Sequence, residues 1–315
     1  MPRLSIVIPC QGGAAEFDAT LVSVLQNRPA NCEVLVVHTE RYDDPYGLAA
    51  EVDFQRASCH SLAGLINAGL AQARGEIVHV LGCGLEATEG WTAAATAHFD
   101  DADVAAVSPL IVGPDGQAVV AAGVQFTRGG RRKLVTDRRV LDAGAGRLRA
   151  SVLGPLLTAA FFRRDVLAAL DGLDESIGDE LADVEAALSI RALGRLHVCE
   201  PAARIVRNAN SSAALPASGF AAGRAAERLF WRHAASRGAA LSLVLHFFAV
   251  LSAGLSLRSV ASLAGRMLAW AEFGSAARYE KKLEGARERL DELAELRVTI
   301  RLPEKRSPAA VRRAA

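Results

Sequence analysis

The strongest constraint on the fold is an alternation of two hydrophobic patterns in the first third of the chain. Short apolar runs occur at Leu4–Ile8, Glu33–Val37 and Glu76–Leu81. Segments with helical spacing lie between them, at Phe17–Asn27 and Ser61–Ala73. Apolar runs separated by amphipathic helices are typical of a sheet with helices packed on its faces. The sequence therefore predicts an α/β domain.

The same alternation continues further along the chain. Asp103–Val107, Ala118–Phe126 and His197–Val206 are predicted strands, and Arg164–Leu170 and Leu181–Leu193 are predicted helices. The chain has 315 residues, enough for one α/β domain of about 200 residues and an appendage.

Three regions follow from these patterns. Residues 1–208 are predicted to form the α/β domain and residues 209–300 a C-terminal helical region, in which Arg278–Arg297 turns Leu283, Leu290 and Leu293 inward. Residues 301–315 are predicted to be a disordered tail.

One helical stretch, Gly238–Leu257, contains no Asp, Glu, Lys or Arg. Its serines and His246 fall on one helical face, and arginines flank it on both sides. Three interpretations remain open: a helix in the membrane interface, a helix packed on a partner or on the main domain, and a membrane span.

Composition excludes several classes of protein. A hydrophobic content of 51% excludes a disordered chain, and a formal net charge of +1 argues against an overall polycation. With only 5% aromatic residues, the chain lacks the stacking surfaces of a nucleic-acid-binding protein. Five scattered cysteines indicate reduced thiols, and the N-terminus lacks a secretory signal. A cytoplasmic protein is expected, peripheral on the plasma membrane if residues 238–257 bind lipid.

A basic segment lies between Arg128 and Arg149. It has only two acidic residues, and it is either a solvated loop, a contact for anionic lipid or polysaccharide, or a source of charge for binding phosphate. Its basic residues are Arg128, Arg131, Arg132, Lys133, Arg138, Arg139, Arg147 and Arg149.

Four groups of residues, in matching order and spacing, resemble the family 2 glycosyltransferases. The resemblance covers about residues 4–207 and implies a GT-A fold, which is a mixed, Rossmann-like sheet flanked by helices. It also implies transfer of a sugar from a nucleotide-sugar to a cell-surface glycan or a lipid-linked acceptor. The groups are Ser5–Pro9 with Ser23–Gln26, Asn67–Gly69 with Arg74–Ile77, Glu89–Trp91, and Gly172–Glu175 with Asp183 and Arg191.

The resemblance implies a donor crevice at the carboxyl ends of the strands. His38 stands where the family usually has an Asp that binds the nucleobase, whereas Asp43 matches a later Asp of the same loop. The donor-binding candidates are Pro9, Gln11, His38, Asp43, Asn67, Gly82 and Gly84.

The family's metal motif is replaced in this chain. Two aspartates separated by one residue are expected after the third strand, to hold Mn²⁺ or Mg²⁺, but Gly82-Cys83-Gly84 stands there. Glycine supplies no carboxylate oxygen, and the nearby Glu86 and Glu89 differ in register from the motif. No cofactor or metal ligand is therefore predicted.

The acceptor side is better preserved. Asp183 matches the carboxylate that takes the proton of the acceptor hydroxyl in the family, and its alternative is a solvated helix residue. Ala182 and Arg207 replace a Glu and a His of the family pattern. The remaining candidates for the acceptor and phosphate side are Arg131, Arg132, Lys133 and Glu185.

Three functions follow from this pattern. One is a metal-independent transferase, in which basic side chains neutralise the diphosphate. The second is a catalytically inactive relative that binds a glycan, a nucleotide or a partner enzyme as a scaffold. The third is an adaptor that binds a membrane surface through its C-terminal helices. The oligomeric state cannot be derived from the sequence.

Overall fold

The computed structural model describes residues 3–11, 13–39, 44–136, 152–209, 219–233, 239–251, 257–272 and 274–301. Asp43, the second half of the basic segment and the tail from residue 302 lie outside these ranges.

One large sheet forms the centre of the molecule. Its strands are β1 (Leu4–Cys10), β2 (Cys32–His38), β3 (Asp53–Arg56), β4 (Ile77–Val80), β5 (Leu85–Ala87), β6 (Val104–Val112), β7 (Val119–Ala121), β10 (Phe161–Arg163) and β11 (Leu196–Arg207). Within the described ranges they follow the order β3-β2-β1-β4-β10-β6-β11-β5, with β7 beside β6.

The sheet is mixed. Strands β1, β2, β3 and β4 pair in parallel, as do β6 and β11, whereas β10 runs antiparallel to both of its neighbours. The carboxyl ends of β1, β2 and β4 therefore meet at one edge. The predicted mixed α/β sheet is confirmed.

A short hairpin stands apart from the sheet. It consists of β8 (Val124–Phe126) and β9 (Arg132–Leu134). The sequence predicted one strand over Ala118–Phe126, but this segment forms two separate strands, β7 and β8. Gly123 takes φ +134° there, a conformation that side-chain-bearing residues rarely adopt.

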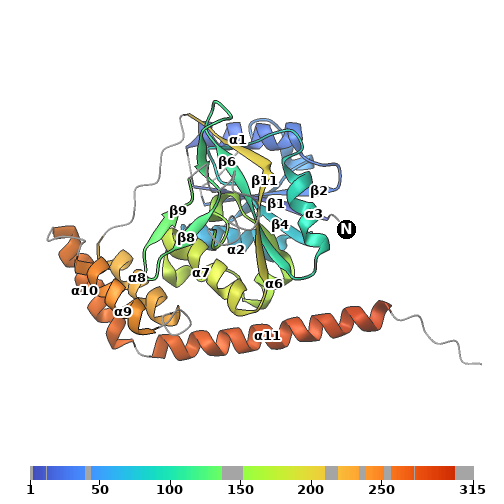
Figure 1. The fold of residues 1–315 in the computed structure, drawn as a ribbon. Coiled ribbons are helices and arrows are strands. Elements are labelled where there is room, and N and C mark those ends of the chain that lie inside the picture. Colours follow the sequence, from blue (N-terminus) through green and yellow to red (C-terminus); the bar gives the residue numbers. More distant parts are fainter. Residues whose placement is uncertain are drawn as a thin grey trace, which may run out of the picture.

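Helices cover both faces of the sheet (Figure 1). Ile6 and Ile8 of β1 pack towards α1 and α3, whereas Val7 points to the other face, towards α2. The helices of this domain are α1 (Ala14–Asn27), α2 (Leu62–Gln72), α3 (Trp91–Ala97), α6 (Arg164–Ala169) and α7 (Asp179–Ala192). Single 3₁₀ turns occur at Leu48–Ala50, His98–Asp100, Leu157–Ala159 and Glu175–Ile177.

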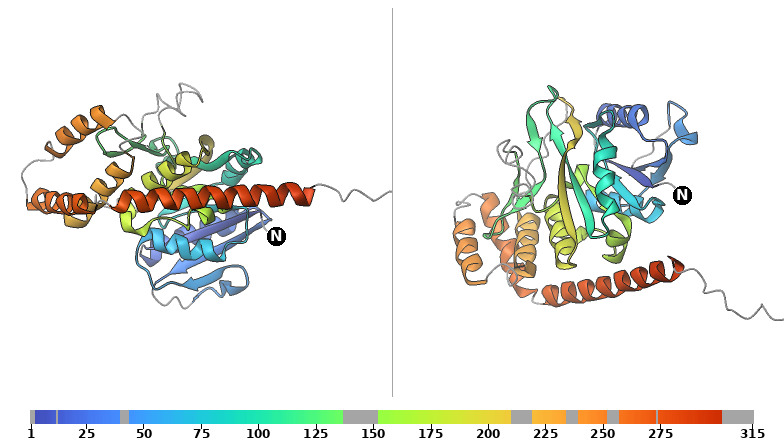
Figure 2. Two further views of the ribbon diagram at one scale, coloured as in Figure 1. Left: turned by 90° about the horizontal axis from the view of Figure 1, so that it is seen from below. Right: turned by 45° about the vertical axis from the view of Figure 1, so that its right-hand side comes forward.

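Four helices follow the sheet domain: α8 (Phe220–His233), α9 (Ala239–Leu251), α10 (Leu257–Ala271) and α11 (Gly274–Arg301). Helices α8, α9 and α10 gather at one end of the molecule, and α11 runs along its underside (Figure 2). Helix α11 is held there by buried Tyr279, Leu283, Ala286 and Leu290, which recur every three or four residues. Leu293, predicted to face inward, is exposed.

The stretch Gly238–Leu257 is not described as one helix, since α9 ends at Leu251 and α10 begins at Leu257. Among the described residues, no helix combines the length and the apolar character needed to cross a bilayer.

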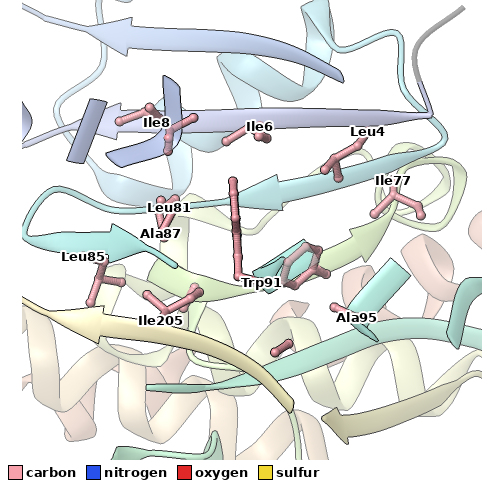
Figure 3. Close-up of a cluster of buried hydrophobic side chains, with 14 of the residues drawn as sticks. Leu4, Ile6, Ile8, Ile77, Leu81, Leu85, Ala87, Trp91, Ala95 and Ile205 are labelled. Atoms are coloured by element: carbon pink, nitrogen blue, oxygen red, sulfur yellow. The ribbon is translucent and has the colours of Figure 1, made fainter. Parts of the chain in front are cut away.

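Trp91 occupies the middle of the core on the α3 side, among Ile6, Leu81 and Ile205 (Figure 3). Its indole Nε1 donates to Nε2 of the fully buried His79 at 3.0 Å, so His79 Nδ1 carries the proton and donates to the Ala160 carbonyl at 3.1 Å. Burial lowers the pKa of His79 to about 3, and burial likewise lowers the pKa of His197 to about 3.

These two histidines predict a loss of stability in acid. Below about pH 6.5 both histidines are protonated in the unfolded chain, whereas in the folded chain they stay neutral down to about pH 3. The free energy of unfolding should therefore fall over this window, by up to about 1.4 kcal/mol per pH unit for each histidine. Urea denaturation at several pH values measures the slope. His79→Gln and His197→Gln should each reduce this slope. An unchanged slope in both variants would contradict the lowered pKa of the two histidines.

Candidate donor and acceptor site

A cavity of about 300 Å³ opens where β1 and β2 end. It is lined by Cys10, Gln11, Thr39 and His60. The parallel register sets Cys10 beside His38, so the residues that follow these two strands lie around the same cavity. This is the edge of the sheet where the sequence predicts donor binding.

Gln11 connects this cavity to helix α7. Its side-chain Nε2 donates to the His60 carbonyl at 2.9 Å and lies 3.5 Å from the Asp179 carboxylate. The other oxygen of Asp179 accepts from the Ala63 backbone N–H at 3.3 Å, at the start of α2. The amino end of α7 is thereby fixed against the donor side.

Asp183 lies one turn after Asp179 on the same face of α7. It is 2% exposed and forms a bidentate ion pair with Arg132, whose Nε lies 3.0 Å from Oδ1 and whose Nη2 lies 2.6 Å from Oδ2. Burial raises the pKa of Asp183 above its ordinary value, and the hydrogen bonds from Arg132 offset only part of that rise. The interpretation of Asp183 as a solvated helix residue is therefore wrong.

The three basic candidates on the hairpin are not equivalent. Arg132 lies on β9 and points to Asp183, whereas Arg131 and Lys133, its neighbours in sequence, are exposed. Alternation along a strand explains the difference, since successive side chains point to opposite faces. Within the described part of the basic segment, only Arg132 contacts the candidate base.

The segment that replaces the metal motif is tightly packed. A Cβ atom on Gly82 would lie 3.0 Å from Cβ of Thr158, and Gly84 takes φ +84°. The Cys83 Sγ lies 3.6 Å from the Pro9 carbonyl, which brings β1 and this segment together.

The carboxylates near this segment do not form a metal site. Glu86 accepts a hydrogen bond from Asn208 Nδ2 at 2.6 Å, and the Asn208 N–H donates to the Gly84 carbonyl at 2.9 Å. In the part of the chain that the structure describes, no group of three His, Cys, Asp or Glu side chains could hold a metal ion. The described side chains around Gly82 and Gly84 therefore do not fit the divalent cation that the resemblance implies.

Two further candidates are engaged in structural contacts. Asn67 Nδ2 donates to the Leu173 carbonyl at 3.0 Å and its Oδ1 accepts from the Leu173 N–H at 2.8 Å, so this amide clamps the loop before α7. Glu185 is buried on the far side of α7, where it accepts from Ser189 at 2.8 Å near Tyr279 of α11. A role of Asn67 in donor binding and of Glu185 in phosphate binding remains a prediction.

Four residues of this site are not among the candidates from the sequence, namely Cys10, Thr39, His60 and Asp179. Cys10 and Thr39 are the direct neighbours of candidates in the sequence. Asp179 lies two residues before the predicted helix Leu181–Leu193, so the helical face that it shares with Asp183 was not predicted. His60 follows no motif, and its place beside Gln11 depends on how two loops converge. The pairing of Arg132 with Asp183 joins residues 51 positions apart and has no local signal.

Comparisons with known proteins identify the fold. No protein-family model and no curated protein sequence matches this chain. Its structure is similar to that of S. aureus TarS 1–349 in complex with UDP-GlcNAc, with a TM-score of 0.57 and 14% identity, over 93% of this chain and 92% of that one. It is also similar to GalNAc-T7 with UDP, GalNAc and Mn²⁺, with a TM-score of 0.56 and 15% identity.

The second match covers 88% of this chain, which spans 58% of the length of GalNAc-T7. The class defined by these likenesses is the GT-A-type fold of the glycosyltransferases, as the sequence resemblance predicted. At this level of identity the likeness is one of fold.

The packing at Gly82 predicts a loss of stability on substitution. In Gly82→Ala the new methyl group would press on Thr158, which should lower the free energy of unfolding by about 1–3 kcal/mol. Urea denaturation measures the change. Gly285→Ala in α11 is the matched control, because its nearest neighbour there is the Arg289 guanidinium at 3.8 Å. That variant should be more stable by about 0.5–1 kcal/mol, and equal effects of the two substitutions would refute the packing argument.

Proposed function

We propose that this protein is a glycosyltransferase that moves a sugar from a nucleotide-sugar to an acceptor hydroxyl, without a divalent cation. The observation that carries the proposal is one arrangement: a cavity at the carboxyl ends of β1 and β2, joined through Gln11 to the helix that bears Asp183. In a GT-A-type sheet this edge is the expected place for a nucleotide. The nucleotides in the two similar structures support this assignment.

Asp183 is the proposed general base. It takes the proton of the acceptor hydroxyl, whose oxygen attacks the anomeric carbon while the nucleoside diphosphate leaves. Its buried position and raised pKa suit a group that must accept a proton near neutral pH. An Asp at the ordinary pKa would be a weaker base.

Arg132 is the proposed replacement for the cation. A guanidinium forms two charge-assisted hydrogen bonds with phosphate oxygens as readily as with a carboxylate. In the proposed reaction it leaves Asp183 for the diphosphate, which both neutralises the leaving group and releases the base. Arg131 and Lys133, the exposed neighbours of Arg132 in the sequence, add positive charge for the incoming donor.

The geometry also favours a second candidate, an inactive relative that binds nucleotide or glycan as a scaffold. The supporting observation is the ion pair itself, because a carboxylate that is 2% exposed and bound at both oxygens cannot reach an acceptor hydroxyl in this state. The two candidates differ in whether Arg132 leaves Asp183 when a donor binds.

The proposed acceptor is a cell-surface glycan or a lipid-linked glycan. The proposed location is the cytoplasmic face of the plasma membrane, with the protein held peripherally. The apolar outer faces of α9 and α10 support this location.

Nucleotide binding can be tested at Cys10, which lines the cavity. A bound nucleoside diphosphate should protect this thiol from alkylation by N-ethylmaleimide, at least about tenfold in rate at saturating ligand. Mass spectrometry of peptides after timed labelling measures the rate for each cysteine, with UDP, GDP, ADP and CDP tested in the presence of EDTA.

Cys32 is the matched control, because it lies at the opposite, amino end of β2 and should show no protection. Protection of Cys10 that requires manganese would refute the metal-independent mechanism. Equal labelling of Cys10 with and without every nucleotide would refute the donor cavity.

The roles of Arg132 and Asp183 can be separated by a double variant. Asp183→Asn and Arg132→Gln should each abolish donor hydrolysis and lower the free energy of unfolding, by up to about 3–5 kcal/mol because each breaks a buried ion pair. Arg132→Gln should also weaken nucleotide binding, whereas Asp183→Asn should leave it within a few-fold.

The double variant Arg132→Gln/Asp183→Asn should recover part of the lost stability but none of the activity. Donor hydrolysis is measured by release of the nucleoside diphosphate, and stability by urea denaturation. Recovery of stability together with activity would mean that the pair only holds the fold. No hydrolysis by the unaltered protein, despite nucleotide binding, would favour the scaffold.

A further inference from the structure

Polar side chains lie at the contacts between helices α8, α9 and α10. Glu227 of α8 is buried, and its carboxylate accepts hydrogen bonds from four side chains on the three helices. The donors are His246 at 2.9 Å, Arg266 at 2.8 Å, Trp231 at 2.8 Å and Trp270 at 3.0 Å. Burial alone would raise the pKa of Glu227, but the bonds from His246 and Arg266 lower it to about 2, so it remains a carboxylate.

Helix α9 turns its polar side chains towards the protein and its apolar side chains outward. Its polar residues Ser242 and His246 face the protein and are buried, and the His246 ring stacks on Phe230 at 3.7 Å. Its large apolar residues face outward, with Phe247 64% and Phe248 59% exposed. In a water-soluble helix the apolar stripe normally faces the core.

Helix α10 also exposes large apolar side chains. Met267 and Trp270 are exposed there, and Trp231 of α8 packs edge-on against Trp270 at 6.1 Å. Monomeric soluble proteins rarely expose large apolar patches.

The contact between α8 and α10 depends on glycine. A Cβ atom on Gly223 would overlap the Ser262 carbonyl oxygen, and one on Gly265 would overlap the Phe220 carbonyl oxygen. The two backbones are therefore in direct contact. Close approach through small residues is the usual way in which helices associate in lipid.

The charge of this region indicates the kind of surface that it meets. Residues 220–272 contain six arginines and two glutamates, with no lysine or aspartate, whereas the whole chain has a net charge of +1. Arg224 and Arg228 share Glu272, Arg266 pairs with Glu227 and Arg232 pairs with Asp174, so the six arginines outnumber these three carboxylates and the region keeps an excess of positive charge. An excess of arginine in helices that expose apolar side chains is typical of proteins that bind anionic lipid.

We infer that α8, α9 and α10 form a membrane-docking unit, whose apolar outer surface enters the interface of an anionic lipid bilayer while the Glu227 network holds the three helices together. This extends the peripheral location proposed above from one segment to a defined three-helix surface. The alternative to be tested is that a second copy of the chain covers this apolar surface.

The inference can be tested with vesicles and the full chain. The protein should pellet with vesicles of phosphatidylcholine mixed with phosphatidylglycerol, and much less with phosphatidylcholine alone. The double variant Phe247→Gln/Phe248→Gln should reduce partitioning into the mixed vesicles at least about tenfold. Val22→Gln/Leu196→Gln is the matched control, because these apolar side chains are 49% and 42% exposed but lie on α1 and β11.

Tryptophan fluorescence provides a second readout. The chain has three tryptophans, of which Trp231 and Trp270 lie in the docking unit and Trp91 is buried in the sheet domain. Vesicles that carry brominated acyl chains should therefore quench part of the emission. Unquenched emission at a lipid concentration that pellets the protein would overturn the inference, since binding would then occur elsewhere.

Two other outcomes would overturn it. One is recovery of the unaltered protein in the supernatant with both kinds of vesicle. The other is a dimer in sedimentation velocity that Phe247→Gln/Phe248→Gln converts to a monomer, without vesicle binding by either form. Nucleotide protection of Cys10 should be the same in all these variants, so failure of the docking unit is distinguishable from failure of the proposed transfer.

Discussion

The ion pair between Arg132 and Asp183 is the contact on which the candidate site depends. It joins the β8–β9 hairpin to helix α7, whose amino end is fixed through Gln11 to the cavity at the ends of β1 and β2. The turn of the same hairpin contacts α9, where the Gly129 carbonyl lies 2.9 Å from His246 Nδ1. One short hairpin thus contacts both the candidate base and the helix with the exposed apolar surface. A charge removed at either end of the pair leaves a buried partner without compensation.

The replacement of the metal motif involves more than two missing carboxylates. The space that an aspartate at position 82 would need is filled by Thr158, and Asn208 binds both Gly84 and Glu86. At the same time an arginine holds the carboxylate on the acceptor side. The resemblance would place a cation beside β4, whereas the positive charge that the structure sets against the candidate base is Arg132 of the hairpin.

Much of the sheet could be predicted from the sequence, because strands such as β1 and β2 are continuous β-branched runs between clear helices. The short strands β3, β5 and β9 and the helix α3 were missed, since three to seven residues carry too little periodicity. Asn67 was identified from a motif, but its clamp on Leu173 depends on a tertiary contact. The inward polar face of α9 was visible in the sequence as Ser242 and His246 on one side, whereas Glu227, the buried carboxylate that His246 contacts, lies on another helix.

Gly82 has a consequence for how such a chain can change over time. An aspartate at this position would crowd Thr158, so the substitution lowers stability before any ligand for a cation exists. A second carboxylate would have to adopt the positive φ of Gly84, which is unfavourable for any residue with a side chain. Because both substitutions cost stability, two aspartates can be introduced here only together with compensating changes in the surrounding packing.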